Sequence, residues 1–221
     1  MKFIKFRVTA VAVAFLASCA TGEFSEALKE FSAARKKYEE LESARVVITD
    51  SLTGAVTENF CFRYEGDTLT YLYRATDGET VYAEYNNGSR LCYGYEGDAD
   101  WTEVTVSDSD FYSYTKAIKH RYTKKTLFFL DEPSVSNVVY RDADGTVVEY
   151  SAEKLNKRSD KEKFSRLTAE FWLDGFGYIR KFERVHALEG GEEYAYLIEV
   201  TDMNAVDVIE RPDFTEALRF R

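Results

Sequence analysis

The sequence predicts an α+β fold in which one antiparallel sheet carries helices on a single apolar face. Three observations predict it. Residues 23–43 place apolar side chains at three- and four-residue steps, which is the period of an amphipathic helix. From Arg45 the period changes to two, and Asp-Gly, Asn-Gly and similar turns separate the short runs. A second helical pattern begins near residue 108 and lies between two groups of strands.

The first nineteen residues have the layout of a secretory signal peptide. Three basic residues precede an apolar run at 8–16, which is too short to span a bilayer. Residues 16–19, LASC, resemble the lipobox of bacterial lipoproteins. That resemblance implies cleavage before Cys19 and modification of its thiol with diacylglycerol, which carries palmitate-like acyl chains. The alternative is ordinary secretion, with Cys19 merely near the cleavage site.

The expected mature chain has 203 residues, because 18 of the 221 are removed. Residues 1–18 are then the signal peptide, residues 19–22 a lipid-anchored linker, and residues 23–221 a single domain. The mature chain has 26 basic and 39 acidic side chains, which repel nucleic-acid phosphates, so nucleic acid is not an expected partner. We expect an extracytoplasmic body held at a bacterial membrane by its lipid anchor.

Residues 45–106 predict an antiparallel meander of about six strands. Two similar heptads, CFRYEGD at 61–67 and CYGYEGD at 92–98, fall in its second and fifth strands. Each heptad places two aromatic residues on one side of a strand and ends in a Glu-Gly-Asp turn. We interpret the heptads as one aromatic strand-and-turn unit that is used twice.

The second half of the chain continues with a helical segment and five further strands. The helix starts near Asp108, and a second short helix covers 124–132, before Pro133. The charged stretch 153–163 is predicted to be an exposed connection. The strand patterns occupy 134–142, 146–152, 165–174, 177–188 and 192–203.

Alternation places most of the aromatic side chains on one face of this sheet. A one-sided sheet must cover its apolar face, and the helix at 23–43 and the segment 108–131 are the available cover. Either these helices fill the face as a packed core, or a cavity remains. In the second case the face is a site for a hydrophobic ligand, lined by Phe60, Phe62, Tyr64, Leu69, Tyr71, Tyr73, Leu91, Tyr93, Tyr95, Tyr194, Tyr196 and Ile198.

The order of elements resembles the LolA/LolB/LppX group of lipoprotein-carrier-like proteins. The segments that carry the resemblance are KKYEELESARVVITDS, NFCFRYEGDTLTYLY, DGETVYAEYNNGSRLCYGY, EFWLDGFGYIRKFERV and EYAYLIEVTDMNAV, and it covers about residues 25–213. It implies a strongly curved antiparallel β-sheet, a half barrel, with the N-terminal amphipathic helix and a short helical lid packed on its apolar face. It also implies a cavity for acyl chains, or a sensor of exposed lipid or protein segments.

The remaining cysteines and the histidines suggest no reactive or metal site. Cys61 and Cys92 are expected about 14 Å apart in a simple meander, and a disulfide needs Cα atoms within about 7 Å. We therefore expect them to be unpaired, although an extracytoplasmic location would permit a bridge. His120 and His186 have no neighbouring ligands at metal spacing, so no metal or cofactor is expected.

Three functions from different classes fit these observations. The first is a membrane-anchored lipoprotein that binds a lipid or acyl chain in the concave face of its sheet, as a carrier or a sensor. The second is an interaction module for another envelope protein, with a closed core and no small ligand. The third is an enzyme, which we do not expect because the sequence has no nucleophile elbow or phosphate-binding glycine loop.

Overall fold

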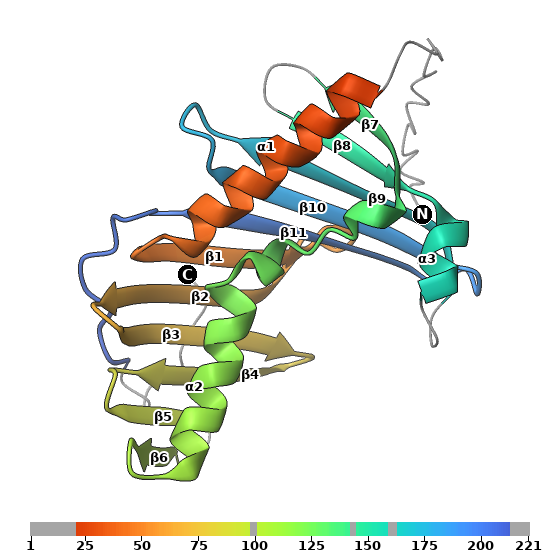
Figure 1. Ribbon diagram of the computed structural model, residues 1–221. Coiled ribbons are helices and arrows are strands. Elements are labelled where there is room, and N and C mark those ends of the chain that lie inside the picture. Colours follow the sequence, from red (N-terminus) through yellow and green to blue (C-terminus); the bar gives the residue numbers. More distant parts are fainter. Residues whose placement is uncertain (1–20, 98–100, 142–144, 159–162, 213–221) are drawn as a thin grey trace, which may run out of the picture.

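The protein is described from a computed structural model, which covers residues 21–97, 101–141, 145–158 and 163–212. Cys19 and the signal segment lie outside the described residues. Eleven strands form one antiparallel sheet in the order β6-β5-β4-β3-β2-β1-β11-β10-β9-β8-β7. A few helices lie on it (Figure 1), so the predicted α+β class is confirmed. Among the described residues β6 and β7 are the two edges, and the sheet is open.

The helices and strands follow the predicted sequence of elements. The helical elements are α1 (Thr21–Glu39), α2 (Ser109–Tyr122) and α3 (Ala152–Arg158), with 3₁₀ turns η1 (Lys125–Phe128) and η2 (Glu132–Ser134). The first group of strands is β1 (Ser43–Asp50), β2 (Ala55–Glu65), β3 (Thr68–Asp77), β4 (Thr80–Asn86), β5 (Arg90–Tyr95) and β6 (Thr102–Thr105). The second group is β7 (Val135–Arg141), β8 (Gly145–Tyr150), β9 (Phe164–Leu173), β10 (Ile179–Leu188) and β11 (Glu193–Thr201).

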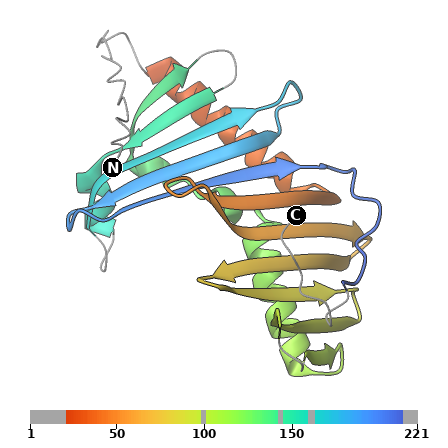
Figure 2. The ribbon, with the colours of Figure 1, turned by 180° about the vertical axis from the view of Figure 1, so that it is seen from behind.

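The sheet consists of two meanders that meet where β1 pairs with β11. This pairing joins residues far apart in the chain, with Val46 opposite Val200 and Ile48 opposite Ile198. In Figure 1, α1 crosses the strands of the second meander and α2 crosses those of the first. Both helices lie on the same side, which we call the helical face. The opposite side, which we call the outer face, is seen in Figure 2.

The glycines of the two Glu-Gly-Asp sequences have the backbone conformation that a turn requires, although Asp98 lies outside the described residues. Gly66 has φ +59° and Gly97 has φ +90°, both in the left-handed region that favours glycine. Gly66 connects β2 to β3, and Gly97 follows β5. The strands that carry the two heptads are therefore β2 and β5, as predicted.

The first helix ends four residues before the end of the apolar pattern that predicts it. The pattern predicts a helix to residue 43, but α1 ends at Glu39 and β1 begins at Ser43. The amides of Glu40 and Leu41 bond to carbonyls three residues back, at 3.1 Å each, which tightens the last turn. Leu41 is 4% exposed, so it belongs to the core although it lies beyond the helix.

Two segments between strands differ from the prediction. The stretch 153–163, predicted as an exposed connection, begins with helix α3. Leu155 is 8% exposed and packs into the core, while Glu153 and Lys157 form an ion pair at 2.6 Å one turn apart. The single short helix predicted at 124–132 is instead the two 3₁₀ turns η1 and η2. Pro133 lies in the first turn of η2, where its missing N–H costs nothing.

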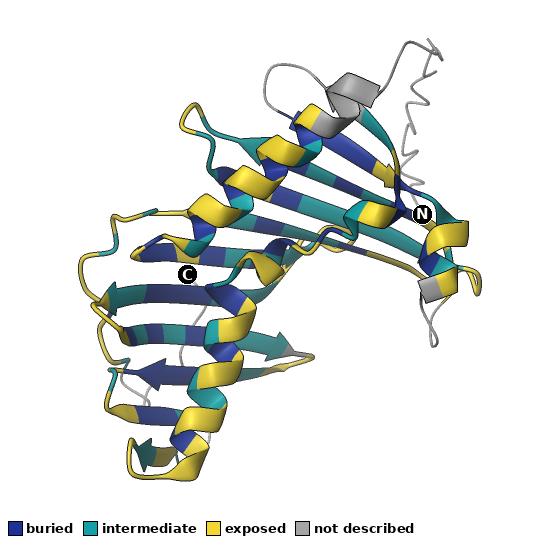
Figure 3. Cartoon of the chain, in the orientation of Figure 1, coloured by how far each residue is buried: buried dark blue, intermediate teal, exposed yellow. Residues whose placement is uncertain are grey.

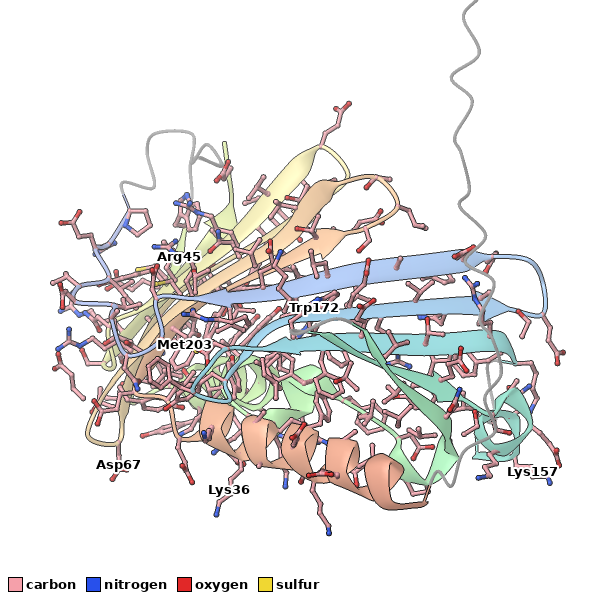
Figure 4. The ribbon with its side chains drawn as sticks, turned by 90° about the horizontal axis from the view of Figure 1, so that it is seen from above. Lys36, Arg45, Asp67, Lys157, Trp172 and Met203 are labelled. Atoms are coloured by element: carbon pink, nitrogen blue, oxygen red, sulfur yellow. The ribbon has the colours of Figure 1, made fainter. Side chains whose placement is uncertain are left out.

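The core lies between the helical face and the helices that cover it. Under α1, the ring of Phe31 lies 4.5 Å from that of Phe171, and Tyr38 lies 4.8 Å from Phe128. Under α2, the ring of Tyr122 stacks on Phe60 at 4.7 Å. Figure 3 shows that buried residues follow the strands beneath both helices. In Figure 4, Lys36 of α1 projects away from the sheet, as expected for the charged side of that helix.

The segment after β11 packs on the outer face of the first meander, which the sequence does not predict. Ile209 and Val206 form a small apolar cluster with Cys61, Tyr85 and Leu72. The guanidinium of Arg63 donates to the carbonyl of Val206 at 3.3 Å and to that of Asp207. In Figure 2 this segment leaves β11 and runs down beside the first meander. Part of the outer face of β2–β4 is therefore buried rather than solvated.

Candidate ligand site on the helical face

All twelve residues predicted to line a ligand site lie on the helical face, but their surroundings differ. The strand register places Phe60 opposite Tyr73, and Tyr71 lies beside Leu91 with one strand between. Seven are buried in the core, namely Phe60, Phe62, Leu69, Tyr71, Tyr73, Leu91 and Ile198. Tyr64, Tyr93 and Tyr196 are partly buried, while Tyr95 and Tyr194 are each 47% exposed. The protein's own helix α2 therefore occupies the face of the first meander.

A buried polar cluster lies beneath α2. The carboxylate of Glu84 on β4, 3% exposed, accepts hydrogen bonds from Tyr82 at 2.6 Å and from Tyr71 at 3.2 Å. On the same face, Asn86 donates to the hydroxyl of Thr115 of α2 at 3.0 Å. Burial raises the pKa of the Glu84 carboxyl above its usual value, and the two tyrosine hydroxyls partly oppose that shift. Glu84 and Asn86 were not singled out from the sequence, although the two-residue alternation within β4 is the signal that could have placed them on the helical face.

Replacing Glu84 with glutamine is expected to make the protein more stable at neutral pH. Because the folded-state pKa is raised, the contribution of Glu84 to stability is present below about pH 4.5 and is lost as the pH rises through the folded pKa. Glutamine cannot ionise, so Glu84→Gln should flatten the pH dependence of Tm between pH 4 and pH 7. Each kcal/mol gained at neutral pH raises Tm by about 2–4 °C.

Glu30→Gln on the exposed side of α1 is the matched control for this substitution, and its Tm should follow the wild-type pH curve. A neutral-pH Tm for Glu84→Gln that lies below that of Glu30→Gln contradicts the assignment of a costly buried charge.

A cavity of about 300 Å³ lies where the two meanders meet. Ile48 of β1 and Ile198 of β11, which are paired in register, form an apolar floor together with Tyr196. Leu127 of η1 forms an apolar wall. Only Tyr196 and Ile198 of the cavity residues belong to the predicted set. Ile48 shares its face with Val46 by alternation, but the position of Leu127 depends on packing that no local pattern reveals.

The rim of this cavity is polar and basic. His120 and Arg121, from the last turn of α2, and Thr126 of η1 complete its lining. The guanidinium of Arg121 pairs with Glu58 of β2, and the hydroxyl of Tyr122 donates to the same carboxylate. The site thus has an apolar floor and a hydrogen-bonding rim, which is the usual composition of a site for a small amphipathic molecule.

The helical face continues beyond the cavity as a partly covered strip on β10 and β11. Tyr196 lies opposite Arg184, and Tyr194 lies opposite His186. The ring of His186 stacks on that of Tyr194 at 5.0 Å between centroids. A guanidinium nitrogen of Arg184 donates to the hydroxyl of Tyr196 at 3.4 Å. This strip places a cation and three aromatic or imidazole rings next to the cavity floor.

A second cavity of about 300 Å³ lies on the far side of α1, between that helix and η1. Its lining is mostly charged and includes the ion pair of Arg35 with Glu132 at 3.4 Å, beside Lys36, Glu39 and Lys125. Burial lowers the pKa of Arg35, an effect that Glu132 opposes. Such a lining has Ala33 as its one apolar side chain, so the cavity over β1 and β11 is the better candidate for a hydrophobic chain.

Cys61 and Cys92 are free thiols on the outer face. They lie on β2 and β5 in one cross-strand row with Leu72 and Tyr85 between them. Burial raises the pKa of both thiols, and with the help of Glu103, whose carboxylate accepts from the thiol at 3.2 Å, that of Cys92 rises to about 11. Both groups are therefore protonated and unreactive at neutral pH.

Among the described residues no helix is long and apolar enough to cross a membrane. In the same part of the chain, no group of three or more His, Cys, Asp or Glu side chains could hold a metal ion. The two histidines lie on different elements, with His120 at the cavity rim on α2 and His186 on β10.

Comparison with known proteins finds similarity to solved structures, among them the following two. No protein-family model matches the chain, and no curated protein matches it in sequence. The crystal structure of LprF from Mycobacterium bovis aligns with a TM-score of 0.45 and 12% identity, over 85% of this chain and 97% of that one. A redesigned beta barrel aligns with a TM-score of 0.19 and 11% identity, over 75% of this chain and 95% of that one. Neither similarity assigns a ligand or partner to this chain.

Proposed function

We propose that this protein is an extracytoplasmic lipoprotein, anchored to a bacterial membrane through acylated Cys19, that binds a hydrophobic ligand on the helical face of its sheet. The ligand is a lipid or an acyl chain, and the protein acts as its carrier or sensor. The observation that carries the proposal is the cavity with the apolar floor of Ile48, Tyr196 and Ile198. The strong half-barrel curvature expected from the sequence belongs to this proposal, since it would shape the face around the ligand.

The size of the cavity suits one acyl chain rather than several. Its volume of about 300 Å³ lies at the lower end of the range for small-molecule sites. Each buried CH₂ group contributes roughly 0.8 kcal/mol, so eight of them contribute roughly 6 kcal/mol. Association itself costs on the order of 4–15 kcal/mol. We therefore expect weak, reversible binding that depends on a high local concentration of lipid, and an anchor in the membrane would supply that concentration.

An envelope interaction module is the second candidate, and a different observation favours it. α2 fills the face of the first meander, so that half of the molecule has the closed core that such a module requires. Exposed apolar side chains such as Phe176, 80% exposed in the turn between β9 and β10, could then contact another envelope protein. For either candidate we propose that the protein is not an enzyme, needs no cofactor and binds no nucleic acid.

Labelling with a photoreactive lipid analogue tests the ligand-binding proposal. Membranes that contain the full-length protein are incubated with a neutral long-chain alcohol bearing a diazirine, irradiated, and the crosslinked peptides are mapped by mass spectrometry. We expect crosslinks at the cavity residues. Leu127→Trp places a larger ring in the cavity wall and should reduce this labelling several-fold.

Val208→Trp is the matched control, because Val208 is 74% exposed in the segment after β11, away from the cavity. Its labelling should equal that of the wild type, and both variants should have wild-type melting curves. Equal labelling of Leu127→Trp and Val208→Trp, or crosslinks confined to the outer face, contradicts ligand binding at this site and favours the interaction module.

A further inference from the structure

Arg184 occupies an unusual position for a cation, because it lies on the apolar side of the sheet. Its neighbours on the helical face are Tyr196 of β11 and Ala169 of β9, which is 1% exposed. Two residues away along β10 is Phe182, fully buried and paired with Ile198 of the cavity floor. The guanidinium also contacts the hydroxyl of Tyr196, which lines the ligand cavity, so the cation lies next to a residue of the cavity floor.

The hydrogen-bonding groups of Arg184 are largely unused. Its Nε atom is buried and has no hydrogen-bond partner among the described residues. Its one hydrogen bond there is the 3.4 Å contact with the hydroxyl of Tyr196. Arg184 as a whole is partly buried, but a guanidinium has five N–H donors, and a donor atom that is itself buried is almost always paired. This arrangement leaves donors that a ligand could satisfy.

Two carboxylates on the helical face, those of Asp50 and Glu58, are directed to other partners. Asp50 lies opposite Tyr196 in the register, but its oxygens accept from the amide of Leu52 at 2.9 Å and from the hydroxyl of Thr53 at 2.8 Å. The carboxylate of Glu58 on β2 accepts hydrogen bonds from the guanidinium of Arg121 and the hydroxyl of Tyr122. None of the described acidic side chains forms an ion pair with Arg184.

Two exposed side chains with apolar surface lie at the turn between β1 and β2 and on the adjoining part of β11. The turn between β1 and β2 is held to β11 by the amide of Ser51, which donates to the carbonyl of Ala195 at 2.9 Å. Leu52 in this turn is 57% exposed, and Tyr194 on the neighbouring strand is 47% exposed. A chain could enter across these two side chains, and its tail could lie on the cavity floor while its head remains at the guanidinium.

We infer that Arg184 binds the anionic head of the ligand, and that the ligand is a single-chain amphiphile ending in a carboxylate or a phosphate. The planar guanidinium offers two parallel donors to such a group, which an ammonium cannot do in the same geometry. The inference rests on the proposed function, because the apolar tail must occupy the cavity over Ile48 and Ile198. It adds that the site selects anions over neutral molecules of the same length.

Competition in nanodiscs of neutral lipid tests this selection with the full-length protein. The neutral photoreactive alcohol labels the site, and dodecanoate, dodecyl phosphate and dodecanol compete with it. In the wild type, one or both anions should compete at about tenfold lower concentration than dodecanol, and the better anion identifies the head group. Arg184→Gln should remove this advantage without changing competition by dodecanol, and Arg184→Lys should retain only part of it.

Arg45→Gln is the matched control, because Arg45 is an exposed residue of β1 on the side of the sheet opposite α1 (Figure 4). It should keep the wild-type preference for anions. Arg184→Gln should melt at or above the wild-type temperature, because it removes an unsatisfied buried donor, and a clearly lower Tm would overturn the inference by indicating a structural role. Competition by dodecanol with no advantage for either anion also overturns it but leaves the proposed function standing. Failure of all three compounds to compete overturns both.

Discussion

Replacing Phe182 with alanine is expected to lower the free energy of unfolding by about 3–5 kcal/mol. Phe182 of β10 is fully buried, and its ring lies 5.9 Å from that of Phe31 in α1 and 5.8 Å from that of Phe128 in η1. The side chain thus joins the sheet, the first helix and the turn after α2. A cavity at this point cannot close unless three elements move together, so the cost should lie near the upper end of the range for such substitutions.

Urea denaturation, followed by the fluorescence of Trp101 and Trp172, measures this loss. Phe176→Ala is the matched control, because Phe176 is 80% exposed in the turn after β9 and the same atoms are removed. Its effect should lie within about 0.5 kcal/mol of zero. Similar losses for the two variants would mean that the packing beneath α1 does not stabilise the fold as described.

The same core supports the ligand site. Phe128 packs against Phe182, and the next residue toward α2 is Leu127, which lines the cavity. Loss of the Phe182 ring should therefore loosen η1 and weaken lipid labelling even under conditions where the sheet remains folded. Phe176→Ala should leave labelling unchanged, since its side chain contributes neither to the core nor to the cavity.

Much of the fold follows from local patterns in the sequence. The alternation of apolar and polar residues placed all twelve predicted residues on one face, and glycines such as Gly66 and Gly97 marked turns that the structure contains. These features depend on the two-residue period of strands and on the left-handed conformations that glycine tolerates. Local patterns were misleading where tertiary packing determines the structure. The charged stretch 153–163 was predicted to be an exposed connection, but it begins with helix α3, whose Leu155 is buried in the core.

The distinction between core and cavity could not be predicted in this way. A residue such as Tyr71 has the same pattern as Tyr196, yet Tyr71 is fully buried under α2 while Tyr196 lines the cavity. What separates them is the pairing of β1 with β11 and the path of α2, both of which join distant parts of the chain. Arg184 illustrates the same limit. A charged residue in a strand is expected to face water, whereas its register places it on the helical face.

Replacing Cys19 with alanine is expected to abolish acylation and cleavage of the precursor. The thiol is the acceptor that the lipobox-like sequence LASC implies, and no other group at that position can form the thioether. Two or more acyl chains give stable membrane anchoring, whereas the apolar run at 8–16 is too short to replace them. Labelling of cells with radioactive palmitate should therefore fall to background in Cys19→Ala, and intact mass should show that residues 1–18 are retained.

Cys92→Ala is the matched control, because it also removes a thiol but one that is buried, free and protonated on the outer face. It should incorporate palmitate at the wild-type level and have the wild-type mature mass. Palmitate incorporation that persists in Cys19→Ala and disappears in Cys92→Ala would reverse the assignment. If Cys19→Ala is still cleaved, and neither the wild type nor Cys92→Ala incorporates palmitate, the protein is secreted in the ordinary way. The ligand site would then have to obtain its lipid without a membrane anchor.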